Sequence, residues 1–208
     1  MKFYYSPGSC SLASHIVLEE IGKSYEAVLV SSKDGSTHSA DYLKINPKGQ
    51  VPVLSIGESV MTENLAIMTY LALSNPGSEL LPNSPEAIAK AIEWISWLSG
   101  LQASGIRGYW RTERFSDDAN AYPGIKKKAL ESLSTAFTLV DFKLKDSQWA
   151  VNDKYSIADP YLLVYFRWGN LLGLDMQNLS NWTAHAKKIE QREAVQRVLT
   201  TENISIWE

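Results

Sequence analysis

Residues 1–22 read MKFYYSPGSCSLASHIVLEEIG, and the fold of the whole chain follows from this stretch. Residues 2–5 form a short, aromatic-rich apolar run, which is typical of a strand buried on both faces. The Ser-Pro-Gly cluster at 6–8 has to turn the chain. Apolar residues then recur at helical spacing, so we expect Ser9 to be the N-cap of a helix that ends at Gly22.

Cys10 is the only cysteine among the 208 residues, and it is predicted to lie in the first turn of this helix. The unpaired amides and the positive dipole end of a helix favour a thiolate over a thiol. Such a position can lower the pKa of a thiol below its free value of about 8.5. On this stretch alone, a reactive cysteine and a buried structural cysteine are both open interpretations.

The composition is that of an ordinary folded protein, with 45% hydrophobic residues and a formal net charge of -3. There is no basic excess that would indicate a nucleic-acid partner. A single cysteine cannot form an internal disulfide, and the N-terminus has no signal-peptide core, so we expect a cytoplasmic protein. No stretch is long enough to predict a membrane span. Of the three histidines, His15 is interpreted as structural, while His38 and His185 lie in predicted polar surroundings and carry no signal.

The next elements complete a small sheet. Residues 25–30 form a second apolar run, and a strand, a helix and a strand within about thirty residues predict a right-handed unit with parallel strands. Residues 53–56 and 59–61 predict an antiparallel hairpin, for which Gly57 suits a type II′ turn. We expect Thr62 to cap the helix that follows.

The second half of the chain is predicted to be helical throughout. Residues 77–85 are rich in breakers and indicate a linker. Ser156-Ile157-Ala158-Asp159 has the pattern of a capping box and opens a mostly apolar helix that runs to about residue 172. A last helical stretch covers roughly 178–199 and is expected to break near Gln191. The predicted fold class is therefore α/β followed by all-α.

Four motifs, in this order and spacing, resemble the cytosolic glutathione transferases, specifically the bacterial beta class. They are YSPGSCSL at 5–12, NPKGQVPVL at 46–54, TEN at 62–64 and SIAD at 156–159. The resemblance covers essentially the whole chain. It implies a thioredoxin-like, glutathione-binding domain at residues 1–77, an all-helical domain with a co-substrate pocket at residues 86–208, and a homodimer.

The resemblance also implies a glutathione site, with glutathione as co-substrate and no other cofactor or metal. Cys10 would be the catalytic residue. Val51, before a cis Pro52, would pair with the extended peptide as an added strand does. The helix start at Glu63 and Asn64 would bind the γ-glutamyl end, although Glu63 could also merely complement the helix dipole. The predicted glutathione-binding set is Ser9, Lys33, Gln50, Val51, Pro52, Glu63 and Asn64, with Lys33 pairing the glycyl carboxylate unless it is an unrelated exposed lysine.

One departure from the family pattern lies on the long helix of the second half. Beta-class members often carry a His-Lys pair where this chain has Ala103 and Ser104, and an asparagine where it has Ser96. The residues that follow are expected either to line a pocket for an apolar co-substrate or to form a packed surface. The predicted co-substrate set is Tyr5, Arg107, Tyr109, Trp110 and Arg111.

The resemblance implies a transferase that conjugates glutathione to electrophilic, apolar compounds, as in detoxification, with thiol exchange at Cys10. A glutaredoxin-like reductase of disulfides is the alternative enzyme, because a single active-site cysteine permits that chemistry when glutathione resolves the mixed disulfide. A non-catalytic binder of hydrophobic ligands is the alternative from another class. The missing His-Lys pair favours exchange over conjugation.

Overall fold

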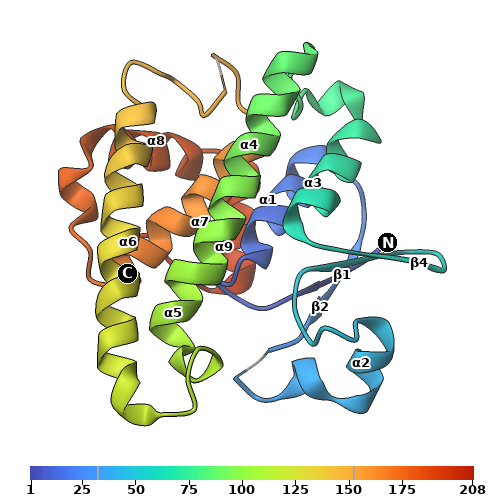
Figure 1. Ribbon diagram of the computed structural model, residues 1–208. Helices are drawn as coiled ribbons and strands as arrows, with labels where there is room; N and C mark the ends of the chain where they lie inside the picture. The colour runs from blue at the N-terminus through green and yellow to red at the C-terminus, as the bar shows by residue number, and fades with distance from the viewer. Residues whose placement is uncertain (32, 152) are drawn as a thin grey trace.

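The structure is a computed structural model that describes residues 1–31, 33–151 and 153–208. In these ranges the strands form one sheet in the order β2-β1-β3-β4 (Figure 1). Strand β1 pairs with β2 in parallel and with β3 antiparallel, and β3 and β4 form an antiparallel hairpin. The parallel unit and the hairpin are thus confirmed. The bounds are β1 (Lys2–Tyr5), β2 (Glu26–Leu29), β3 (Val53–Ile56) and β4 (Ser59–Thr62).

Both faces of the sheet are covered, because successive side chains of β1 point to opposite sides. Phe3 is fully buried in the main core together with helices α1 (Ser11–Ile21) and α3 (Asn64–Leu73). Tyr4 points the other way, and its ring lies 5.8 Å from that of Tyr42 on helix α2 (Ala40–Ile45). Figure 1 shows α2 on the opposite side of the sheet from α1 and α3.

Two helix starts differ from the prediction by one residue. The N-cap of α1 is Cys10 and not Ser9, because a tight turn at this point lets the Leu12 amide donate to the Ser9 carbonyl at 3.1 Å. The N-cap of α3 is Glu63 and not Thr62, which is the last residue of β4. Gly22 ends α1 as predicted, with a positive φ of 66°.

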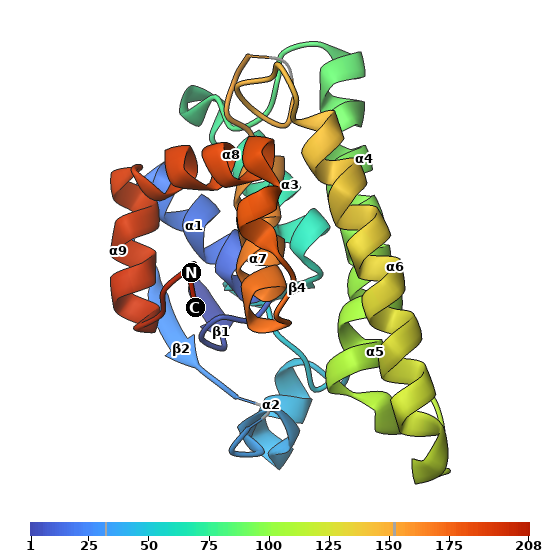
Figure 2. The same ribbon diagram turned by 90° about the vertical axis from the view of Figure 1, so that its left-hand side faces the viewer.

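The second half is helical and is built around helix α7. Twelve consecutive residues of α7, Ala158 to Gly169, are buried, as expected for the centre of this half. Helices α4 and α6 run side by side along one flank (Figures 1 and 2). The predicted break near Gln191 is confirmed as the gap between α8 and α9. The bounds are α4 (Pro85–Leu101), a π-helical turn (Gln102–Ile106), α5 (Arg107–Trp110), α6 (Tyr122–Lys143), α7 (Ala158–Leu171), α8 (Ser180–Glu190) and α9 (Glu193–Glu202).

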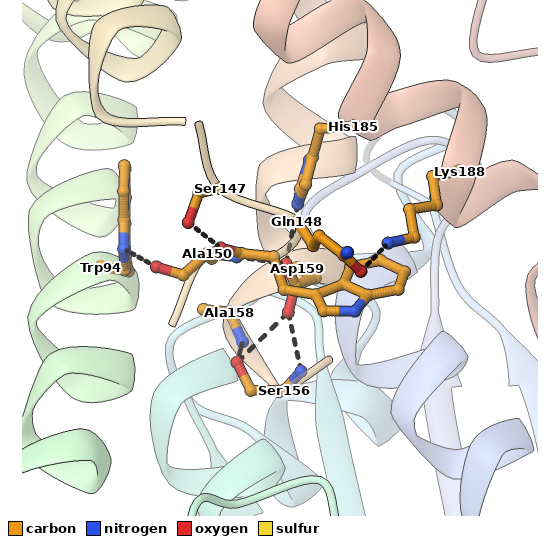
Figure 3. Close-up of polar contacts among 10 residues, drawn as sticks. Trp94, Ser147, Gln148, Ala150, Ser156, Ala158, Asp159, His185 and Lys188 are labelled. Atoms are coloured by element: carbon orange, nitrogen blue, oxygen red, sulfur yellow. Dashed lines mark hydrogen bonds and ion pairs between the residues drawn. The ribbon is translucent and has the colours of Figure 1, made fainter. Parts of the chain in front are cut away.

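The carboxylate of Asp159 holds the start of α7 to the loop before it and to α8 (Figure 3). One oxygen accepts from the Ser156 amide at 2.7 Å, which is the Asp159 half of the predicted capping box, while the N-cap of α7 is Ile157 and not Ser156. The other accepts from the Ala150 amide at 2.8 Å and from Nε2 of His185 at 2.7 Å. The expectation that His185 lies in polar surroundings is therefore wrong: it is buried, because its partner Asp159 lies in the core.

The C-terminal helix fixes the turn that precedes Cys10. Buried Glu202 accepts from the Gly8 amide at 2.8 Å and from Nδ1 of His15 at 2.7 Å, so His15 has the structural role predicted for it. Gly8 has a φ of 67°, and a Cβ at this position would lie 2.6 Å from Nη1 of Arg167. Glycine is therefore favoured at residue 8 for its conformation, and a larger residue would also have to displace the end of the Arg167 side chain. Figure 2 shows α9 beside α1.

No helix within the described ranges is long and apolar enough to cross a membrane. The chain passes from α3 to α4 through a 3₁₀ turn at Pro76–Ser78 and the segment up to Ser84, whose hydroxyl accepts from the Ala87 amide. The domain limits at residues 77 and 86 stay a prediction.

Candidate functional site

A cavity of about 430 Å³ lies between the part of the chain that contains the sheet and a helical wall. Helix α4, the π turn, the start of α5 and α7 form this wall. Six of the residues on its first side are Cys10, Lys48, Val51, Pro52, Glu63 and Asn64. The helical wall contributes Ser96, Ser99, Gln102, Ala103, Arg107 and Tyr161. Residues from five separate stretches of the chain therefore meet at one hollow.

Cys10 lies half-buried at the floor of this cavity. Its thiol donates to the carbonyl oxygen of Val51, with Sγ and the oxygen 3.5 Å apart. Burial raises the pKa of the Cys10 thiol, while the side chains of Gln102, Asn64 and Arg107 act in the opposite direction. The expectation that the helix start lowers this pKa is wrong, because the loss of solvent disfavours the thiolate more than the helix end favours it.

The segment from Gln50 to Pro52 presents its backbone to the cavity. The Val51–Pro52 peptide bond is cis, as predicted. The Tyr42 hydroxyl and the Asn46 side-chain amide both donate to the Gln50 carbonyl, each at 2.7 Å. These two bonds hold the segment in place, and the neighbouring Val51 carbonyl accepts from the Cys10 thiol.

A charged pair lies beyond Pro52, at the start of α3. Glu63 has a φ of 72° and a ψ of 127°, an unusual conformation for a residue other than glycine and one that tends to occur at functional sites. Its carboxylate lies 2.5 Å from Nζ of Lys48, which also donates to the Thr62 hydroxyl at 3.0 Å. Both side chains are more than half exposed, so this ion pair is weak and open to exchange with a charged ligand.

The helical wall is polar near Cys10. The Tyr161 hydroxyl donates to Oε1 of Gln102 at 3.1 Å and lies 3.3 Å from the Ser99 hydroxyl. Nη2 of Arg107 lies 3.4 Å from Oε1 of Gln50 and so bridges the two sides of the cavity. A wall of this kind suits a co-substrate with groups that form hydrogen bonds more than a purely apolar one.

Two residues of the predicted glutathione set lie outside the cavity. The Ser9 hydroxyl is 2.8 Å from that of Ser11 and accepts from the Ser11 amide, so it is used to build the turn. Lys33 is exposed and is not among the described residues that line the cavity. The other five members of the set, Gln50, Val51, Pro52, Glu63 and Asn64, all line it.

Of the predicted co-substrate residues, the structure brings only Arg107 to the described lining. Tyr5 is buried in the core, with its ring 4.9 Å from that of His15. The Tyr109 ring is covered by Nζ of Lys126, 5.7 Å from the ring centroid. Trp110 packs edge-on against Trp168, and Arg111 is exposed where α5 ends. These four were predicted from sequence proximity to Arg107 or Cys10, which does not determine the direction of a side chain.

Lys48, Gln102 and Tyr161 are among the lining residues that were not predicted as site residues from the sequence. Lys48 lies inside the NPKGQVPVL motif, two residues before Gln50, and that position was a usable signal. Gln102 and Tyr161 had no such signal, since they reach the cavity through the π turn and through the packing of α7 on α4.

The sequence matches a known protein family and several known proteins. Residues 1–73 match the family described as glutathione S-transferase, N-terminal domain. The chain is 35% identical to glutathione S-transferase GstA of Escherichia coli O157:H7, over 98% of this chain and all of that protein.

Solved structures give the same result. The structure of a sphingomonad glutathione S-transferase complexed with glutathione has a TM-score of 0.83 at 33% identity, covering 99% of this chain and all of the other. A bacterial beta-class glutathione S-transferase from Sphingomonas chungbukensis has a TM-score of 0.82 at 30% identity, with coverage of 99% and 100%. The fold is a thioredoxin-like domain followed by a helical domain. The chain belongs to the glutathione S-transferase family.

Proposed function

We propose that this chain is a glutathione S-transferase of the beta-class type, with glutathione as co-substrate in the cavity at Cys10. The observation that carries the proposal is the position of the Cys10 thiol. It lies against the backbone of Val51, between a charged pair on one side and a polar helical wall on the other. An extended tripeptide with a thiol in its middle residue and charges at both ends fits this arrangement.

The ends of glutathione can be assigned from the order of charges along the cavity. The cysteinyl residue pairs with the Val51 backbone, which places its thiol beside Cys10. The γ-glutamyl end lies at the start of α3, where Glu63 accepts from the ammonium and the amide of Asn64 meets the carboxylate. Gln50 and Arg107 contact each other at the other end of the Gln50–Pro52 segment. These two side chains receive the glycyl carboxylate.

Two reactions are compatible with this site. In conjugation, the glutathione thiolate attacks an electrophilic carbon, forms a C–S bond and expels the leaving group with its electron pair. In exchange, the Cys10 thiolate attacks a glutathionylated disulfide, forms a mixed disulfide with glutathione and releases the other thiolate; free glutathione thiolate then displaces Cys10 and leaves as oxidised glutathione. Ala103 supplies no acid or base, so we expect exchange on a disulfide substrate to be faster than conjugation to a small electrophile.

The proposed assembly and cellular location of the protein follow from the same family resemblance. Large apolar side chains are exposed on α6 and at the end of α3, including Phe142 at 69% and Leu73 at 64%. A second copy of this chain in a two-fold dimer is the proposed partner for these side chains. We place the protein in the cytoplasm, with a glutathione-binding domain at residues 1–77 and a helical domain at residues 86–208.

Calorimetric titration with glutathione tests the site. Glu63→Ala should weaken binding by about tenfold or more, because the ammonium of the ligand loses a charge-assisted partner. Glu26→Ala is the matched control, since Glu26 also forms an exposed ion pair with a lysine, Lys2, but lies outside the cavity. Equal affinity of wild type and Glu63→Ala would contradict the assignment of the γ-glutamyl end.

A further inference from the structure

The family pattern leads us to expect a histidine and a lysine near the reacting sulfur, and this chain has Ala103 and Ser104 instead. Ala103 lines the cavity but carries no polar group. Ser104 is exposed, and its hydroxyl donates back to the Gly100 carbonyl at 3.0 Å. Neither residue can replace the missing pair, so any donor to the sulfur has to come from another position.

Gln102 occupies that position because of the π turn. The Arg107 amide donates to the Gln102 carbonyl, a spacing of five residues. In a regular α-helix, residues five apart would be about 140° apart around the axis. The wider turn instead lets Gln102 and Arg107 face the same cavity, where both line the surface with Cys10. Interruptions of this kind in α-helices are frequent at functional sites.

A hydrogen bond from Tyr161 fixes the orientation of the Gln102 side-chain amide. Its oxygen, Oε1, accepts from the hydroxyl of Tyr161, which is 1% exposed. Burial raises the pKa of Tyr161, so its hydroxyl keeps the proton that it donates. A carboxamide whose oxygen is held in this way presents its two N–H donors elsewhere. Gln102 lines the same cavity as Cys10, and its side chain acts to lower the pKa of the Cys10 thiol, against the effect of burial.

We propose that Gln102 is a catalytic hydrogen-bond donor to the Cys10 sulfur and that Tyr161 is the positioning residue that orients it. The proposal rests on the proposed exchange reaction and names the group that takes the place of the His-Lys pair. When the bond between the two sulfurs of the mixed disulfide breaks, its electron pair goes to Sγ of Cys10 and the Gln102 amide donates to it. The amide gives up no proton, so it stabilises the leaving thiolate without acting as an acid.

The test measures the rate of alkylation of Cys10 by iodoacetamide as a function of pH. Gln102→Leu should raise the apparent pKa of the thiol by about one unit, which slows alkylation about tenfold below that pKa. Gln102→Glu, of the same size but with a negative charge, should raise it further. Tyr161→Phe should shift it in the same direction by less, and Ser104→Ala, on the same turn but outside the cavity, should match wild type.

A Gln102→Leu or Gln102→Glu profile that superimposes on wild type would overturn the proposal. Because Gln102→Glu keeps the volume of the side chain, it remains informative if Gln102→Leu does not fold. A merely structural role would lower the melting temperature without moving the apparent pKa. Turnover of glutathione by the wild-type chain is measured separately, so that a failure of the proposed function is distinguished from a failure of the role of Gln102.

Discussion

Replacing Asp159 by alanine should destabilise the whole chain. The buried carboxylate accepts hydrogen bonds from two backbone amides, of Ala150 and Ser156, and from Nε2 of His185. The alanine variant leaves these three donors in the core without their acceptor. Each buried donor left unsatisfied costs about 1–3 kcal/mol, so the free energy of unfolding should fall by roughly 3–9 kcal/mol. Domains are commonly stable by only about 5–15 kcal/mol, so this loss would be a large part of the total.

Asp159→Asn is the matched variant, because it keeps the volume and one acceptor. With its oxygen toward Ser156, its amide group can donate to Nε2 of His185 once the imidazole proton moves to Nδ1. The Ala150 amide then stays unpaired, as does Nδ1 of His185, which already has no partner among the described residues, so the expected additional cost is about 1–3 kcal/mol. The ordering wild type, asparagine, alanine is therefore part of the prediction.

The assay is urea denaturation, followed by circular dichroism and by tryptophan fluorescence at one protein concentration. Seven tryptophans make fluorescence a sensitive probe of the helical half. An Asp159→Ala variant whose free energy of unfolding lies within about 1 kcal/mol of the wild-type value would contradict this prediction, since it would mean that the three donors find other partners.

Three further predictions concern the cavity. Because burial raises the pKa of the Cys10 thiol, its alkylation at pH 7 should be slower than that of free cysteine and should accelerate as the pH rises; a profile centred below the free-thiol value of about 8.5 would contradict this. Because the pKa of the Cys10 thiol is raised, wild type should be more stable than Cys10→Ser below the free-thiol pKa. This advantage should be lost as the pH rises through the raised pKa, which melting curves taken across pH would measure. Cys10→Ala should abolish disulfide reduction and keep glutathione affinity within a few-fold, whereas Ala103→His should speed conjugation of an aryl halide. If the wild type conjugates the aryl halide rapidly and Cys10→Ala does not change that rate, another group activates the glutathione thiol.

Much of the fold was predictable because local signals agreed with one another. The breakers at Ser6-Pro7-Gly8, the glycine that ends α1, and Gly57 between β3 and β4 each specify a backbone conformation that few other residues would accept. The capping box at Ser156 and Asp159 was recognised for the same reason. The cis bond before Pro52 came from the family resemblance, since nothing local distinguishes it from an ordinary trans proline.

The rest depended on long-range packing that no local pattern encodes. The spacing of residues 102–107 does not reveal a π turn, and without that turn Gln102 and Arg107 would not face one cavity. The pKa of the Cys10 thiol is raised, whereas the sequence led us to expect a lowered value. The helix start is visible in the sequence, but the burial of the thiol is not. His185 was missed because its partner lies 26 residues earlier, at Asp159.

The most direct test of the central claim is steady-state turnover of glutathione by the wild-type chain, with products identified by mass. Glutathione is offered with a panel of electrophiles and, separately, with a glutathionylated disulfide. We expect an enzyme-dependent product that saturates with glutathione, with disulfide reduction faster than aryl-halide conjugation. No product above the uncatalysed background in either arm, from protein that binds glutathione in calorimetry, would contradict it and leave a binding protein in place of a transferase.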